Sequence, residues 1–124
     1  MIASRIALAL RPNENGIHDL ALTDDGHLDL VYDAEAIGQH ARQRTMTFSG
    51  EWFIDTTCGV PWLEQILGRQ FDAALAESVI KKELVETDGV TGIEAFSLSY
   101  SRTVRGINVT RATLATVYEE EASV

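Results

Sequence analysis

The sequence has a single cysteine, Cys58, and this excludes an internal disulfide. Such a chain suits a reducing compartment. Long apolar runs are also missing, since no stretch approaches the roughly 20 residues needed to cross a bilayer. The apolar start, MIASRIALALRP, is interrupted by Arg5 and Arg11 and lacks the parts of a signal peptide. We therefore expect assembly in the cytoplasm and no membrane partner.

Basic residues are few as well. Ten Lys and Arg stand against nineteen Asp and Glu, which gives a net charge of −9. Nucleic-acid binding needs concentrated Lys and Arg, so a nucleic-acid partner is excluded. The 45% hydrophobic content fits a globular protein, and 124 residues fit one domain. Residues 1–16 are expected to form an N-terminal arm or edge strand that ends in the turn-forming RPNENG.

The first half of the chain predicts a hairpin followed by a helix. Residues 17–32, IHDLALTDDGHLDLVY, alternate around an Asp-Gly turn at residues 24–26, where positive φ is tolerated. A helix is expected to begin near Ala34, with Asp33 as its N-cap, and to end by Gly50. A short helix is expected at residues 61–68.

The second half predicts one long helix and two long strands. Residues 72–88 show helical spacing, with Asp72 as the cap and Gly89 after the end. The strands that follow meet at a turn near residues 105–106, and slips in alternation predict bulges before Phe96 and after Val109. The tail EEEASV is expected to fray. Strands at both ends with helices between them predict an α+β fold: a small, mostly antiparallel sheet with helices packed on one face.

Catalytic and metal-binding patterns are weak. Glu51 and Asp55 could form the carboxylate pair of a glycosidase. The preferred interpretation is that Glu51 makes a local cap or salt bridge and that Asp55 closes a turn with Thr56 or Thr57. The three histidines lack metal-ligand spacing, and Cys58 has no His near it in the sequence. We expect no enzyme activity, no metal and no cofactor.

Two features are typical of binding surfaces. Trp52, Phe53 and Trp62 flank a Gly-Val-Pro corner at residues 59–61, and these rings are either core or binding anchors. The strand at residues 107–117, if it lies at a sheet edge, can accept a strand from another chain. A Thr- and Arg-rich face of that strand is expected to meet solvent or a partner: Thr110, Arg111, Thr113 and Thr116. A strand merely exposed to water explains the same pattern.

A longer pattern resembles a known family. Gln39 and Arg42 precede Gly-Glu-Trp-Phe at residues 50–53, Asp55, Gly-Val-Pro-Trp at residues 59–62 and Ile-Leu-Gly at residues 66–68. This pattern, with the helix and strands after it, resembles contractile-tail phage baseplate proteins over residues 18–118. These form the sheath-initiator or baseplate wedge family, which includes a Mu-like branch and the related wedge subunit of type VI secretion baseplates. Some relatives carry Glu-Pro-Arg where Trp52 and Phe53 follow Glu51 here, as in the Mu-like branch.

The resemblance implies a structural protein of the virion. It implies a fold similar to the C-terminal domain of the sheath subunit, a sheet edge that the first sheath ring extends, and six copies in a tail baseplate. The implied partners are tail sheath protein, baseplate wedge proteins, and tube or hub proteins. Another tail role, in the tube or as a completion protein, is the alternative, and a peptidoglycan hydrolase using Glu51 is a weaker one. The expected protein-binding residues are Glu51, Trp52, Asp55, Pro61, Trp62, Ile107, Val109, Arg111 and Thr113.

Overall fold

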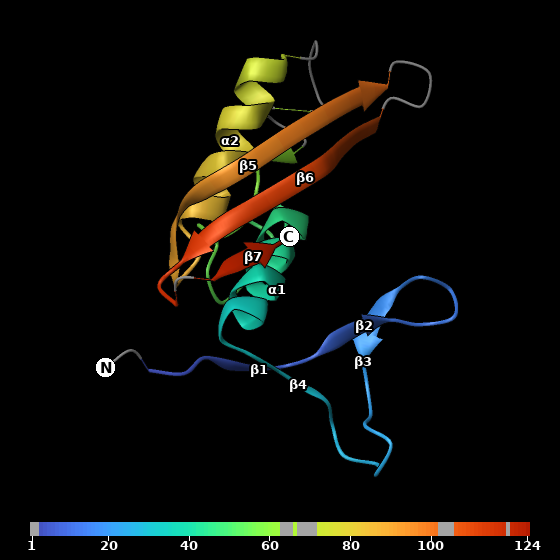
Figure 1. The fold of residues 1–124 in the computed structure, drawn as a ribbon. Helices are drawn as coiled ribbons and strands as arrows, with labels where there is room; N and C mark the ends of the chain where they lie inside the picture. Colours follow the sequence, from blue (N-terminus) through green and yellow to red (C-terminus); the bar gives the residue numbers. More distant parts are fainter. Residues whose placement is uncertain (1–2, 63–65, 67–71, 102–105, 119) are drawn as a thin grey trace.

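The predicted α+β fold is confirmed. The computed structural model describes residues 3–62, 66, 72–101, 106–118 and 120–124. Two helices, α1 (Asp33–Met46) and α2 (Ala73–Val85), pack against one antiparallel sheet with the strand order β5-β6-β7 (Figure 1). Its strands are β5 (Val90–Ser101), β6 (Gly106–Thr116) and β7 (Glu121–Ser123). Within the described residues, no helix is both long enough and apolar enough to span a membrane.

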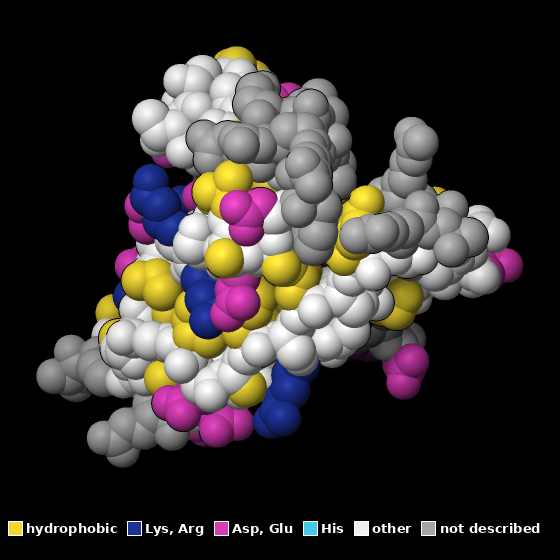
Figure 2. Space-filling view, turned by 90° about the horizontal axis from the view of Figure 1, so that it is seen from above, with side chains coloured by type: hydrophobic (Ala, Val, Ile, Leu, Met, Phe, Trp, Pro, Cys, Tyr) yellow, Lys and Arg dark blue, Asp and Glu magenta, His cyan; other side chains and the backbone are white. Residues whose placement is uncertain are grey.

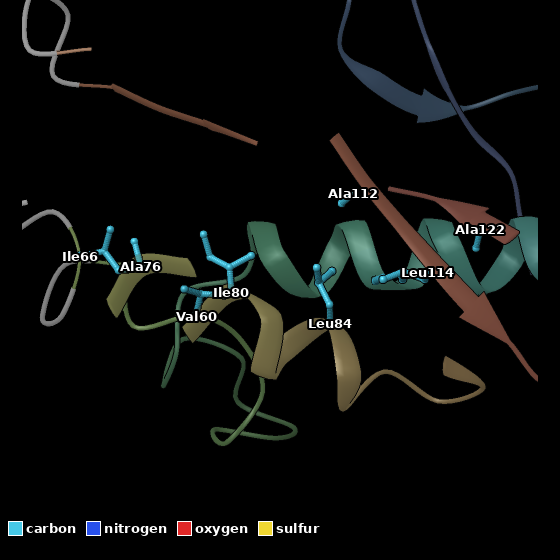
Figure 3. Packing of buried hydrophobic residues seen from close by; sticks show 9 residues of the cluster. Val60, Ile66, Ala76, Ile80, Leu84, Ala112, Leu114 and Ala122 are labelled. Atoms are coloured by element: carbon cyan, nitrogen blue, oxygen red, sulfur yellow. The ribbon is translucent and has the colours of Figure 1, made fainter. Parts of the chain in front are cut away.

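The main core lies between the helices and this sheet. Ile80 and Leu84 of α2 and Leu114 of β6 are at most 1% exposed (Figure 3). Ala41 of α1, which is fully buried, belongs to the same cluster. Burying one Ile or Leu side chain contributes about 1.5–3 kcal/mol. The helical spacing predicted for residues 72–88 agrees with the burial of Ile80 and Leu84 on one face of α2.

The helix ends match the predictions only in part. Asp72 is the N-cap of α2, as expected, and its carboxylate accepts from the amides of Ala74 and Leu75. Asp33 does not cap α1, because its carboxylate accepts instead from Ser4 Oγ and the amide of Arg5, and Tyr32 stands at the N-cap position. Helix α1 also ends earlier than predicted, at Met46, and leaves Gly50 in a separate turn.

An N-terminal ribbon lies on the other side of α1 from the β5-β6-β7 sheet (Figure 1). Strand β1 (Ile6–Leu8) pairs with β4 (Leu30–Tyr32), and β2 (Leu10–Pro12) pairs with β3 (His18–Leu20). The turn expected at residues 24–26 is present, with Gly26 at a φ of +86°. The predicted hairpin is short. Its two segments bridge at Leu22 and Leu28, with flanking amide–carbonyl bonds from Thr23 to His27 and from Asp29 to Ala21, and otherwise pair with residues 6–12.

Strands β5 and β6 form the predicted long hairpin, with bulges at both predicted slips. The register shifts between Ile93 and Ala95 and again at Thr110, which stands opposite no single partner. The turn expected at residues 105–106 lies mostly outside the described residues, with Gly106 as the first residue of β6. The short helix expected at residues 61–68 also lies largely outside them.

The prediction of a frayed tail was wrong. Residues 121–123 form β7, which pairs with residues 113–115 of β6, and Ala122 is 2% exposed. Helix α1 packs directly on this strand at Gly38, where a Cβ atom would lie 2.6 Å from the carbonyl oxygen of Ser123. A glycine and an alanine thus let helix and strand approach closely, and this contact anchors the tail.

Candidate functional site

Strand β6 is open along half of one side. It pairs with β5 over its whole length, from Gly106 to Thr116. On the other side β7 covers only residues 113–115, and the amide of Val124 donates to the carbonyl of Ala112 at 3.1 Å. Among the described residues, no strand lies against residues 106–111 on that side. A row of uncovered N–H and C=O groups there can pair with another strand.

A groove of about 290 Å³ runs beside this open edge. Its walls come from both helices, from β6 and from the chain end, and it lies where a continuation of β7 would run. Most of its lining is apolar, so an incoming strand could bury side chains there while pairing with β6. The lining residues are Arg42, Thr45, Met46, Ile80, Leu84, Asn108, Val109, Ala112 and Val124.

The four candidate residues on β6 have different environments. Ile107 and Val109 pack against the core cluster, so their side chains face the helices. Arg111 is exposed, whereas Thr113 is partly buried and pairs with Ser123 of β7.

Thr116, expected on the solvated face of β6, is instead 6% exposed. Its hydroxyl donates to the carbonyl of Glu120 at 2.7 Å, which closes the turn before β7. The predicted Thr- and Arg-rich face therefore ends before Thr116.

Between α1 and α2, the loop at residues 47–60 is held at its base by one buried carboxylate. Glu83, which is 5% exposed, accepts at Oε1 from Arg44 Nη2 at 2.8 Å and from the amide of Gly59 at 2.9 Å. Gly59 has a φ of +108°, and a Cβ atom there would lie 2.6 Å from the carbonyl of Thr47. The amide of Val60 donates to the carbonyl of Thr47 and the amide of Ser49 donates to the carbonyl of Val60, and these bonds close the loop. The ion pair between Glu83 and Arg44 and the close approach at Gly59 thus hold the two ends of the loop at residues 47–60 together.

The tip of this loop exposes large apolar side chains. Trp52, Phe53 and Ile54 are 44%, 87% and 68% exposed. On the face of the molecule seen from above, hydrophobic side chains likewise reach the surface among Lys, Arg, Asp and Glu (Figure 2). Exposed aromatic side chains in a loop with a fixed base are typical of contact surfaces.

Both carboxylates of the loop make local contacts. Asp55 Oδ1 accepts from the Thr57 hydroxyl at 2.5 Å and from the Thr57 amide at 3.0 Å, as the turn interpretation predicted. These bonds lower the pKa of Asp55. Glu51 accepts from the amide of Phe48 at 3.4 Å. The general acid of a carboxylate pair needs a raised pKa, so Asp55 does not suit that role.

The comparison with known families decides the identity. Residues 8–119 match the family of contractile injection system sheath initiators. The chain belongs to this family. No curated protein matches the chain. The sheath initiators are structural components of contractile tails, and the family implies contact with sheath and baseplate components.

In this sheath initiator, the two tryptophans have different environments. Trp62 packs against the core and its Nε1 donates to the carbonyl of Thr45 at 2.8 Å, next to the partly buried Pro61. Trp52, by contrast, is exposed. Both alternatives left open by the sequence, core and surface, therefore occur, one at each tryptophan.

Sequence reasoning missed Glu83 and the groove. Glu83 follows Ile80 by three residues and adjoins Leu84, so it lies on the buried face of α2. A carboxylate at that position indicates a buried cationic partner. The groove could not be found in the same way, because it depends on where β7 stops.

Proposed function

We propose that this sheath initiator starts the first sheath ring of a contractile phage-tail baseplate by accepting a strand of the sheath subunit at residues 106–111. The open half of β6, with an apolar groove beside it, carries the proposal. The chain acts as a single domain, in six copies per baseplate, between wedge and tube proteins of the virion tail. In this proposal its sheet is similar to the C-terminal domain of the sheath subunit. The first ring of sheath subunits then adds to a surface similar to that of another sheath subunit.

The groove matters because backbone pairing alone is too weak. Six residues of an antiparallel edge offer up to about six hydrogen bonds. Each contributes about 0.5–1.5 kcal/mol net. Association costs about 4–15 kcal/mol in lost freedom of motion. Side chains buried in the groove, at about 25 cal/mol per Å² of apolar area, supply the difference.

The opposite edge of the sheet is less suitable. Strand β5 carries register shifts at Val90/Gly92 and at Ile93/Ala95, so its outer edge is irregular. Bulges of this kind twist an edge away from further pairing. On β6 the bulge at Thr110 leaves residues 106–109 in regular pairing with β5. We therefore expect the strand to add at β6, with regular pairing at residues 106–109 and an interruption at Thr110 before Arg111.

The loop at residues 47–60 serves a second contact, with wedge proteins. Trp52 provides the apolar anchor of this contact, and the carboxylates of Glu51 and Asp55 form its polar edge. Pro61 and Trp62 hold the end of the loop against the core. Arg111 and Thr113 border the proposed strand site on β6, where Ile107 and Val109 supply its apolar side.

A charge placed in the groove tests the strand site. Met46 lines the groove and is 62% exposed, so Met46→Asp leaves the core intact. The matched control is Val85→Asp, an exposed apolar residue at the end of α2 that is not among the groove residues. Sheath polymerisation is followed by light scattering on baseplates that carry each variant.

We expect Met46→Asp to slow the start of sheath assembly at least about tenfold, because a carboxylate would be desolvated when the strand enters. Val85→Asp should match the wild type. Equal rates for both variants, or sheath assembly on baseplates without this chain, would contradict the proposal.

A further inference from the structure

The N-terminal ribbon exposes an unusually apolar face. Ile6 pairs with Tyr32, Leu8 pairs with Leu30, and Leu22 bridges Leu28. Directly paired residues share a face, and so do residues two apart along a strand. Leu10, the even-numbered partner of Leu20, is partly buried beside α1. The exposed large apolar side chains at the other even positions are here called the ribbon face: Ile6, Leu8, Leu20, Leu22, Leu28, Leu30 and Tyr32.

The opposite side of the ribbon faces α1 and is lined by smaller side chains. Ala9 and Val31 are at most 1% exposed and pack with Ala36 of α1. On the same side, Arg11 reaches Glu35 of α1 at 2.7 Å. The ribbon thus turns Ala9 and Val31 toward its own helix, while most of its large apolar side chains stay exposed.

The ribbon face is uncovered in the isolated chain. Its seven side chains are between 37% and 68% exposed, with Leu22 the most exposed. The β2–β3 hairpin of the ribbon projects to the side (Figure 1). Single exposed leucines are common, but seven exposed large apolar side chains on two neighbouring strand pairs and the bridge beside them mark an interaction site. A partner bound to the ribbon face would bury side chains of both strand pairs of the ribbon at once.

The ribbon carries more acidic than basic residues. Residues 5–32 contain five Asp and Glu against two arginines, and Arg5 is already paired with Asp88 outside the ribbon. Within the described residues, Arg11 pairs with Asp29 and Glu35 on the α1 side, and no Lys or Arg forms an ion pair with Glu14, Asp19 or Asp24. Two copies of the chain placed face to face would bring these carboxylates together. A partner with cationic side chains would neutralise them.

We infer that the ribbon face binds a baseplate protein through a segment that presents apolar side chains flanked by Lys or Arg. This contact attaches the chain to the baseplate, whereas the open edge of β6 recruits sheath. The inference rests on membership of the sheath-initiator family and does not depend on strand addition at β6. The two surfaces lie on different sheets, so each can be altered while the other is left intact.

The test measures binding to purified baseplates that lack this chain, by co-sedimentation with the labelled full-length protein. The variant is the double substitution Leu20→Ser and Leu22→Ser, at side chains 54% and 68% exposed. The matched control is Val85→Ser, which removes an exposed apolar side chain from α2. We expect the double variant to bind at least about tenfold more weakly and the control to bind as the wild type does. Equal binding by the double variant would overturn the inference.

Charge reversal tests the chemistry of the partner. Asp24→Lys with Asp25→Lys should weaken binding, and added salt should weaken binding of the wild type. Binding unchanged by charge reversal and by salt would contradict a cationic partner. A wild-type dimer in light-scattering chromatography that becomes a monomer in the Leu20→Ser, Leu22→Ser variant would show that a second copy is the occupant, and this too would overturn the inference.

The same assay separates this surface from the β6 edge. Met46→Asp should join baseplates normally and fail only to start sheath. If it also fails to join, the two surfaces act as one, and the assignment of attachment to the ribbon face is wrong.

Discussion

Replacing Glu83 by Gln should remove the charge that holds α1, α2 and the loop at residues 47–60 together. Glu83 and Arg44 have side chains only 6% and 17% exposed, with Nη2 and Oε1 2.8 Å apart. Removing one partner of a buried ion pair costs about 3–5 kcal/mol, because the remaining charge stays desolvated. The amide oxygen of Gln can still accept from Gly59, so we expect the lower value, about 3 kcal/mol.

A loss of this size is easy to measure. Small domains are stable by about 5–15 kcal/mol, so the change removes a large part of the total. It corresponds to a decrease in melting temperature of about 10 °C for a chain of this length. Urea unfolding followed by tryptophan fluorescence gives the free energy of unfolding directly.

The matched control is Glu86→Gln. Glu86 is 48% exposed and lies 3.8 Å from the same guanidinium, so its loss should cost less than about 1 kcal/mol. The double variant Arg44→Met, Glu83→Met should recover much of the stability, because it leaves no buried charge unpaired. If Glu83→Gln were no more costly than Glu86→Gln, Glu83 would not be the anchor of the loop.

Four further results are expected. Gly38→Ala should destabilise the fold by about 1–3 kcal/mol and speed amide exchange in β7, since its Cβ would meet the Ser123 carbonyl at 2.6 Å. Asp72→Ala should cost about 1 kcal/mol in urea unfolding, through loss of the α2 cap. Burial raises the pKa of the Cys58 thiol, so a disulfide reagent at pH 8 should modify native protein at least about tenfold more slowly than unfolded protein. Hydrogen bonding by Arg5 lowers the pKa of Asp88 in the folded protein. The stability that Asp88 contributes is therefore fully present above about pH 4 and is lost as the pH falls through the folded pKa. Melting temperatures measured from pH 6 to pH 2 check this, and the melting temperature of Asp88→Asn should fall less over this range than that of the wild type.

The sequence predicts long, regular elements well. Helix α2 has both a capping residue and an apolar stripe, and both appear in the structure. The bulges in the β5–β6 hairpin were predictable, because a break in alternation of apolar residues leaves a residue without a partner. Local pattern and tertiary packing agree at these places.

Short elements were missed where distant packing decides. Strand β7 has the polar sequence Glu-Ala-Ser and would not persist alone. It is stable because Gly38 lets α1 approach it, and this depends on residues more than 80 positions away along the chain. Asp33 failed as a cap for a similar reason, since the backbone near Ser4 and Arg5 competes for its carboxylate.

The alternation of apolar and polar residues also does not determine which face of a strand pair packs against a helix. It correctly indicated that residues 17–32 have an apolar and a polar side. It did not indicate that the large apolar side chains would stay exposed, because this depends on α1 packing Ala36 against Ala9 and Val31 and bonding the ribbon backbone through Gln39. The same limit applies to Trp52 and Trp62, whose identical side chains have opposite environments set by the loop between them.

The most direct measurement is the structure of the intact baseplate with its first sheath ring, at side-chain resolution. It should show a strand of a sheath subunit paired with residues 106–111 of β6, with apolar side chains in the groove beside Met46 and Val109. A sheath ring that contacts the chain elsewhere, with this edge facing solvent or closed by residues of the same chain, would contradict strand addition at β6.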